Sequence, residues 1–126
     1  MYFKLPMSIT ANNVNTHQQQ STWYLYLIEN KLGQLYTGIT TSPERRISQH
    51  RGEIVGGARA LKGKGPLQFR AIFLIGDRST ASKVEYKVKQ LSKEKKRAIV
   101  KQKVLPESLF IALCDNSQYI CPSNYQ

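Results

Sequence analysis

Long apolar runs are missing from this sequence. No segment approaches the roughly 18 consecutive apolar residues that a membrane-spanning helix needs, so we expect no membrane partner. The N-terminal residues include Lys4 but no apolar segment of the kind that secretory signals carry. We therefore expect a cytoplasmic location.

Cysteine is scarce, which bears on disulfides and on zinc. The two cysteines, Cys114 and Cys121, are separated by six residues, and no second pair of Cys or His lies near them. This spacing is poor for a zinc site, and in a reducing compartment cysteines remain unpaired. We interpret both as free thiols.

Acidic residues are also few. The chain has 8 Asp and Glu against 19 Lys and Arg, which gives a formal net charge of +11 and an isoelectric point of about 9.9. The basic residues gather at 45–70 and 83–103. A small domain with such clusters is attracted to polyanions, and we expect nucleic acid as the partner. A membrane surface fits poorly, because residues 93–103 lack a wide apolar face opposite their lysines.

The length of 126 residues fits one domain. Residues 8–21 are rich in Asn, Gln and Thr and offer little to bury, so we expect residues 1–21 to be a disordered N-terminal extension. The folded domain is predicted at 22–103, and 104–126 is interpreted as a C-terminal tail.

The first strongly patterned stretch begins with residues 23–28, which are aromatic or aliphatic throughout, as in a buried strand. A polar turn with an Asn and a Gly separates them from a second strand at 34–40. So short a connection favours an antiparallel hairpin. Alternation places Tyr26 on one face of the first strand, and Tyr36 with Gly38 on one face of the second.

Helices are expected around a third strand. A hydroxyl N-cap, a proline and an acid at 42–44 predict a helix near 43–54. Residues 67–75 form an almost continuous apolar strand, and helical spacing then predicts helices near 79–91 and 92–103. The fold class is α/β, or α+β by strict segregation. We expect a three-stranded, mainly antiparallel sheet flanked by helices, in the order β-β-α-β-α-α.

Residues 56–65, GGARALKGKG, form a basic loop rich in glycine. It differs from a Walker A loop, because Lys64 is followed by Gly65 instead of Ser or Thr. Two interpretations stay open. The loop either contacts phosphates through backbone amides that approach a nucleic acid strand, or it is a flexible connector.

Several of these residues fall in an ordered pattern. Tyr24-Leu25-Tyr26 is followed by Tyr36-Thr37-Gly38, and Arg46 comes eight residues after that glycine. His50 lies one helical turn beyond Arg46, and Glu85 falls on a downstream helix. Over roughly residues 22–103 this ordered set resembles the GIY-YIG nuclease superfamily, in particular its short single-domain bacterial members of poorly defined role. Thr37 stands where an isoleucine is usual in the second motif.

The resemblance implies a metal-dependent endonuclease that hydrolyses phosphodiester bonds in DNA, in repair or processing, with RNA as an alternative substrate. Glu85 would hold one divalent ion, Mg²⁺ or Mn²⁺, through few protein ligands and several waters. Arg46 would fork onto two phosphate oxygens. Tyr26 or Tyr36 would orient or deprotonate the attacking water, and His50 would donate a hydrogen bond to phosphate or relay a proton. Which tyrosine takes which part stays open.

Further basic residues are predicted to bind the nucleic acid: Arg45, Arg51, Arg59, Lys62, Lys64, Lys87 and Lys89. The site residues also have structural interpretations, because tyrosines on strands commonly pack in a core and Glu85 can pair with Lys89 at i,i+4. Gly38 is interpreted as a position for close backbone packing behind the site.

A second hypothesis belongs to a different class: a non-catalytic nucleic-acid-binding module that keeps the nuclease fold. Longer members of the superfamily carry an Asn after the metal-binding glutamate, whereas no Asn occurs here between Asn30 and Asn116. Activity would then be weak, structure-directed or dependent on an unknown protein partner. Tyr36, Arg46 and Glu85 together favour the enzyme, because binding alone does not need the glutamate.

Overall fold

The structure is a computed structural model that describes residues 21–56, 65–109 and 118–125. Residues 1–20 of the predicted extension, Cys114, and the loop residues Arg59, Lys62 and Lys64 lie outside these ranges. Within the ranges, no helix combines the length and apolarity needed to cross a membrane. Cys121 is an exposed free thiol.

The chain order is two strands, a helix, a strand, two helices and a short fourth strand. β1 (Trp23–Glu29) and β2 (Leu35–Thr40) precede α2 (Pro43–His50), β3 (Gln68–Gly76), α3 (Arg78–Lys89) and α4 (Lys93–Gln102). A 3₁₀ turn, η3 (Glu107–Leu109), comes before β4 (Gln118–Ile120) and a second 3₁₀ turn, η4 (Pro122–Tyr125). The strands lie in the order β2-β1-β3-β4, and each neighbouring pair is antiparallel. The predicted α+β class is confirmed.

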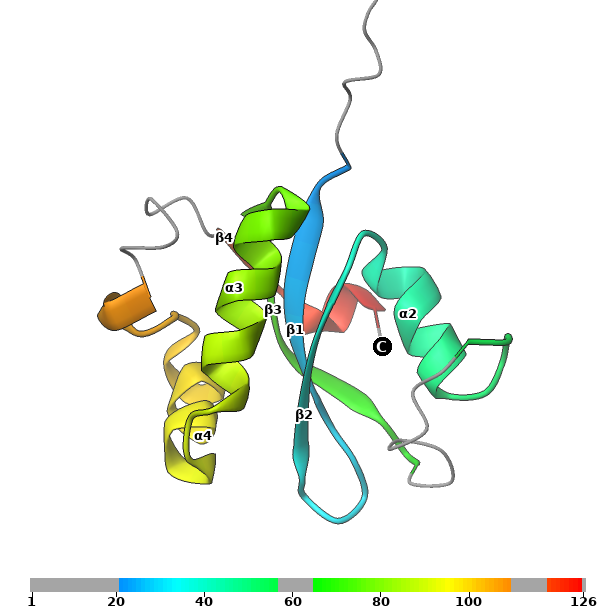
Figure 1. Cartoon of the computed structure of the whole chain (residues 1–126). Coiled ribbons are helices and arrows are strands. Elements are labelled where there is room, and N and C mark those ends of the chain that lie inside the picture. Colours follow the sequence, from blue (N-terminus) through cyan, green and yellow to red (C-terminus); the bar gives the residue numbers. More distant parts are fainter. Residues whose placement is uncertain (1–20, 57–64, 110–117, 126) are drawn as a thin grey trace, which may run out of the picture.

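The sheet separates two apolar clusters (Figure 1). α3 and α4 cover one face of the sheet, and α2 lies on the other. Leu25 and Leu27 of β1 pack with Val84 of α3 on the first face. Tyr26 points to the second face, where it packs in the same cluster as Ile47 of α2. The predicted alternation along β1 therefore decides which of its side chains can meet α2.

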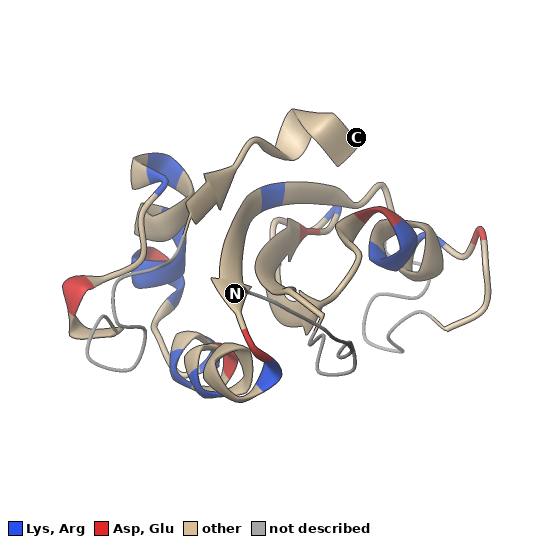
Figure 2. Cartoon of the chain, turned by 90° about the horizontal axis from the view of Figure 1, so that it is seen from above, with Lys and Arg blue, Asp and Glu red and all other residues tan. Residues whose placement is uncertain are grey.

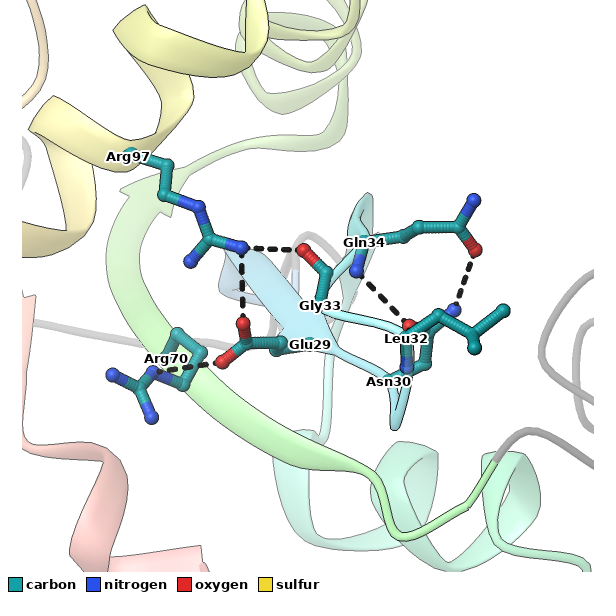
Figure 3. A network of polar contacts seen from close by, with 7 residues as sticks. All are labelled: Glu29, Asn30, Leu32, Gly33, Gln34, Arg70 and Arg97. Atoms are coloured by element: carbon teal, nitrogen blue, oxygen red, sulfur yellow. Dashed lines mark hydrogen bonds and ion pairs between the residues drawn. The ribbon is translucent and has the colours of Figure 1, made fainter.

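The β1–β2 turn is held by one buried asparagine (Figure 3). The Asn30 Oδ1 atom accepts hydrogen bonds from the backbone N–H groups of Leu32, at 2.9 Å, and Gln34, at 3.0 Å. The Asn30 Nδ2 atom donates to Gln34 Oε1 at 2.9 Å. Gly33 adopts φ +79°, a conformation that side chains disfavour. This turn sets the register in which Tyr26 lies opposite Gly38.

Glu29 ties the same turn to α4 and β3 (Figure 3). Its carboxylate lies 3.0 Å from Arg97 Nη2 and 3.6 Å from Arg70 Nε. Arg97 also donates a hydrogen bond to the carbonyl of Gly33. One guanidinium on α4 thus holds both the end of β1 and the turn that follows it.

The helices begin at side-chain caps. The Ser42 hydroxyl accepts from Arg45 N at 3.2 Å, as the sequence predicted for the start of α2. Asp77 caps α3 by accepting from Thr80 N at 2.8 Å. The hydrogen bonds that Asp77 accepts from Thr80 hold the pKa of its carboxyl below the usual value. The caps fix where α2 and α3 start and so which of their residues face the sheet.

Two details of the predicted fold are wrong. The sheet has a fourth strand, because β4 pairs with β3 inside the stretch interpreted as a tail. Three residues are too few to show alternation, and the strand is held by packing of Tyr119 on Phe73, with ring centroids 5.5 Å apart. The first helix ends at His50 instead of near residue 54. Gly52 there adopts φ +83°, which is incompatible with a continuing α-helix.

Candidate functional site

Tyr26 lies at the centre of the candidate site. Its side chain is only 1% exposed, and its hydroxyl lies 2.9 Å from His50 Nε2. Gly38 is directly opposite on β2, and a Cβ atom at that position would collide with the Tyr26 hydroxyl and ring. Gly38 therefore gives the phenol the space it occupies, as expected of a close-packing position.

His50 joins the two tyrosines of the predicted motifs. It is the last residue of α2 and is 4% exposed. Its ring centroid lies 5.9 Å from that of Tyr26 and 5.8 Å from that of Tyr36. Burial, helped by the positive charge of Arg46, lowers the pKa of His50 to about 4. The imidazole is therefore neutral at physiological pH.

Arg46 lies one helical turn before His50 and is held in place by neighbouring groups. Its Nη1 atom donates to Gln49 Oε1 at 2.7 Å and to the Gly56 carbonyl at 2.8 Å. Its charge acts on both Tyr26 and His50. Gln49 was not predicted as a site residue. Its spacing of three residues from Arg46 on one helix is the signal that could have identified it.

The pKa of Tyr26 identifies its neighbours. Burial raises the pKa of Tyr26 to about 12, although a hydrogen bond and the charge of Arg46 lower it. Electrostatic interaction with Tyr36 and Glu85 raises it further. Arg46, Tyr36 and Glu85 are therefore the groups whose charge or ionisation acts on the Tyr26 hydroxyl. Tyr36 is half-buried on the edge strand β2 and so has more access to solvent than Tyr26.

Glu85 comes from the opposite side of the sheet. It lies on α3, which contacts both β1 and β2. Its carboxylate forms an ion pair with Lys89 at 3.2 Å, and the two side chains are 23% and 50% exposed. The predicted structural pairing of Glu85 is thus present, while its charge also reaches Tyr26.

The donor set near Glu85 can be compared with the needs of a divalent metal. Among residues 21–56, 65–109 and 118–125, no group of three or more His, Cys, Asp and Glu could enclose an ion. A zinc site of the usual kind needs such a group. A single, partly exposed carboxylate instead suits Mg²⁺ or Mn²⁺, because Mg²⁺ keeps several of its waters and binds through one or two carboxylates. The residues therefore fit a hard divalent ion at Glu85.

The predicted nucleic-acid-binding residues lie on both sides of the sheet. Figure 2 shows Lys and Arg on α2, α3 and α4. Arg45 is exposed on α2, whereas Arg51 donates to the Leu67 carbonyl at 2.8 Å and is tied to the start of β3. Lys87 and Lys89 are exposed on α3. The remaining three, Arg59, Lys62 and Lys64, lie outside the described residues.

Comparisons with known proteins place this geometry in a family. The model of the GIY-YIG catalytic domain matches residues 22–98. The match covers more than half of the chain, so the chain belongs to the GIY-YIG nuclease family. The matched range includes the five residues predicted for catalysis and metal binding: Tyr26, Tyr36, Arg46, His50 and Glu85.

The similar proteins are short bacterial GIY-YIG proteins of the group named UPF0213. A UPF0213 protein of Photorhabdus laumondii is 53% identical over 81 residues, which cover 64% of this chain and 76% of that protein. A UPF0213 protein of Pectobacterium carotovorum is 46% identical over 96 residues, covering 76% and 93%. A solution NMR structure of a UPF0213 protein from Bacillus halodurans is 36% identical, with a TM-score of 0.44 and coverage of 73% and 96%.

Proposed function

We propose that this protein is a metal-dependent endonuclease that hydrolyses phosphodiester bonds in DNA. One arrangement carries the proposal: His50 lies 2.9 Å from the Tyr26 hydroxyl and packs on the ring of Tyr36. Arg46 lies one turn before His50 on α2, and α3, which carries Glu85, packs against both β1 and β2. A binding module has no need for a carboxylate at such a place, because an acid repels phosphate. A nuclease needs one to hold its metal.

The two tyrosines take different parts. With a pKa of about 12 and almost complete burial, Tyr26 stays protonated at neutral pH and is shielded from substrate. It holds His50 through the 2.9 Å hydrogen bond. Tyr36 is the tyrosine with solvent access, and we assign to it the orientation of the attacking water.

Hydrolysis adds one water molecule across the phosphodiester. The water oxygen bonds to phosphorus, one phosphorus–oxygen bond breaks, and the proton lost by the water is balanced by the proton gained by the leaving oxygen. Neutral His50 contacts both tyrosine rings and is the group through which this proton can be relayed.

Arg46 neutralises the phosphate. Gln49 and Gly56 fix its Nη1 atom, so the guanidinium is oriented before substrate arrives. Its other donors can then fork onto two phosphate oxygens, a geometry that lysine does not reproduce. A preoriented cation also avoids reorganisation during the reaction.

Glu85 would hold the divalent ion, with Lys89 displaced from the carboxylate. The ion, when bound, supplies charge stabilisation at the phosphate and at the leaving oxygen. The basic residues of α2 and α3 would hold the DNA backbone on either side, with RNA as an alternative and with DNA repair or processing in the cytoplasm as the setting.

The alternative is a nucleic-acid-binding module without catalysis. The ion pair between Glu85 and Lys89 favours it, because the lysine already neutralises the carboxylate without a metal. In this case DNA binding would persist, and no variant would cut.

Nicking of supercoiled plasmid tests the proposal. Wild type, Arg46→Ala and Glu85→Gln are compared with and without Mg²⁺ or Mn²⁺. Glu94→Gln is the matched control, because Glu94 is an exposed helical acid away from the site. We expect metal-dependent nicking by wild type and Glu94→Gln, and its loss in the two site variants. If wild type binds DNA but does not nick it with either metal, the non-catalytic binding module is favoured. If all four proteins nick equally, Arg46 and Glu85 are not catalytic and the proposed site is wrong.

A further inference from the structure

Tyr86 has an unusual environment for an aromatic residue. Its side chain is 65% exposed, and within the described residues it is the one aromatic among the exposed large apolar side chains. The tyrosines on the described strands, in contrast, are half-buried or buried. Tyr86 lies on the middle of α3, a regular helix.

Its position on the helix surface links it to the candidate site. It follows Glu85 directly, and residues three apart on a helix are neighbours. Lys83 and Lys89 lie three residues before and after it, so the two lysines flank Tyr86 on the helix surface. Lys89 in turn forms the 3.2 Å ion pair with Glu85. Consecutive helical residues point about 100° apart, so Tyr86 lies next to Glu85 on the outward side of α3, with Lys89 between them on the helix surface.

Packing against the residues that the structure describes does not account for this tyrosine. Its helical neighbours at four residues are Ser82 and Gln90, both polar and exposed, and the apolar stripe of α3 runs along Ala81, Val84 and Val88 on a different face. Tyrosine also has only middling helix propensity. An aromatic ring between lysines is, in contrast, the combination that binds single-stranded nucleic acid.

We infer that Tyr86 is a stacking platform for the base of an unpaired nucleotide beside Glu85, with Lys83 and Lys89 on the flanking phosphates. This inference names the substrate class of the proposed site and rests on the proposed function for its location there. In a paired duplex each base face is covered by its neighbours in the stack. A single strand, a gap or a flap offers a free face to the ring. The site therefore selects DNA with unpaired nucleotides.

Binding without metal tests the inference separately from cutting. Dye-labelled oligothymidine and a fully paired duplex of equal length are titrated with protein in EDTA, and anisotropy is recorded. Tyr86→Leu removes the π face but keeps an apolar side chain, and Tyr86→Phe keeps the face but removes the hydroxyl. Leu32→Ala is the control, because Leu32 is similarly exposed, at 63%, in the β1–β2 turn. Urea unfolding of each variant verifies that it is folded.

We expect Tyr86→Leu to bind oligothymidine roughly 5- to 150-fold more weakly, the range for one stacked base, and to bind the duplex within about twofold of wild type. Tyr86→Phe and Leu32→Ala should bind as wild type. The salt dependence should be unchanged in Tyr86→Leu, because no phosphate contact is lost. Unchanged oligothymidine binding, an equal loss on the duplex, or a matching loss in Tyr86→Phe would each overturn the inference.

The plasmid assay distinguishes this failure from failure of the proposed function. If Tyr86→Leu binds normally while nicking still requires Glu85, only the stacking platform is refuted. If Tyr86→Leu loses oligothymidine binding but wild type does not nick, Tyr86 is a stacking residue of a non-catalytic binding module and the endonuclease proposal fails.

Discussion

The Tyr26 hydroxyl and His50 Nε2 are 2.9 Å apart, and this contact joins the central strand β1 to the last residue of α2. Both groups are almost completely buried. Their pKa values move in opposite directions, up for the phenol and down for the imidazole, because burial disfavours the charged form of each. The pair is thus kept neutral over the whole physiological range.

The neutral imidazole predicts acid sensitivity of folding. Burial lowers the pKa of His50 from its ordinary value near 6.5 to about 4 in the folded protein, so the unfolded chain binds more protons between these values. The free energy of unfolding should therefore fall as pH drops from 6.5 to 4, with at most about 3 kcal/mol from this group. Urea unfolding at several pH values measures it. His50→Asn should show a shallower fall over the same window, and parallel curves for the two proteins would contradict the prediction.

Gly38→Ala should destabilise the fold and displace Tyr26. The added Cβ meets the Tyr26 hydroxyl and ring, which are held by a backbone register and cannot move aside freely. We expect a loss of about 1–3 kcal/mol, the usual range for overpacking. The double variant with Tyr26→Phe removes the oxygen from the collision. In a double-mutant cycle by urea unfolding, the alanine should therefore cost less in the Tyr26→Phe background; equal costs would contradict the clash.

The sequence was sufficient for the hairpin, the helices and the membership of the family, because each depends on local spacing. Alternation in β1 and the cap at Ser42 needed no tertiary information. β4 was missed because its three residues pair through packing of Tyr119 on Phe73, a contact distant in sequence. The helix end at His50 depended on the backbone conformation of Gly52, which glycine permits but does not require.

Spacing predicted that Tyr26, Tyr36 and His50 share a surface, and the structure brings these three rings together, but their separate roles could not be predicted. Spacing alone left Tyr26 and Tyr36 equivalent. Their difference arises from the sheet order, in which β1 is central and β2 is at the edge. The partners of Arg46 and the pairing of Glu85 with Lys89 likewise depend on side-chain positions, which motifs do not specify.

Thr37→Val should stabilise the protein. Thr37 is 3% exposed, and within the described part of the chain its hydroxyl has no hydrogen-bond partner. Valine has nearly the same shape and removes the desolvated polar group, so we expect a gain of about 1 kcal/mol. The buried position also prefers an aliphatic residue, in agreement with the isoleucine usual in this motif. The midpoint of urea unfolding measures the change, with Thr41→Val, at a less buried position, as the control; a loss of stability in Thr37→Val would show that the hydroxyl is satisfied.

Lys89→Ala should tighten divalent metal binding, because the ammonium group and the ion compete for the Glu85 carboxylate. The pair is half exposed on the lysine side, and exposed ion pairs are worth about 0–1 kcal/mol, so the gain should be at most about fivefold in Kd. Titration of Mn²⁺ followed by electron paramagnetic resonance measures free ion directly and needs no activity. Lys87→Ala is the matched control, since it removes the same charge from α3 but its side chain lies on another flank of the helix. If both variants tighten binding equally, the effect is one of net charge; if Lys89→Ala weakens it, the lysine supports the site instead of blocking it.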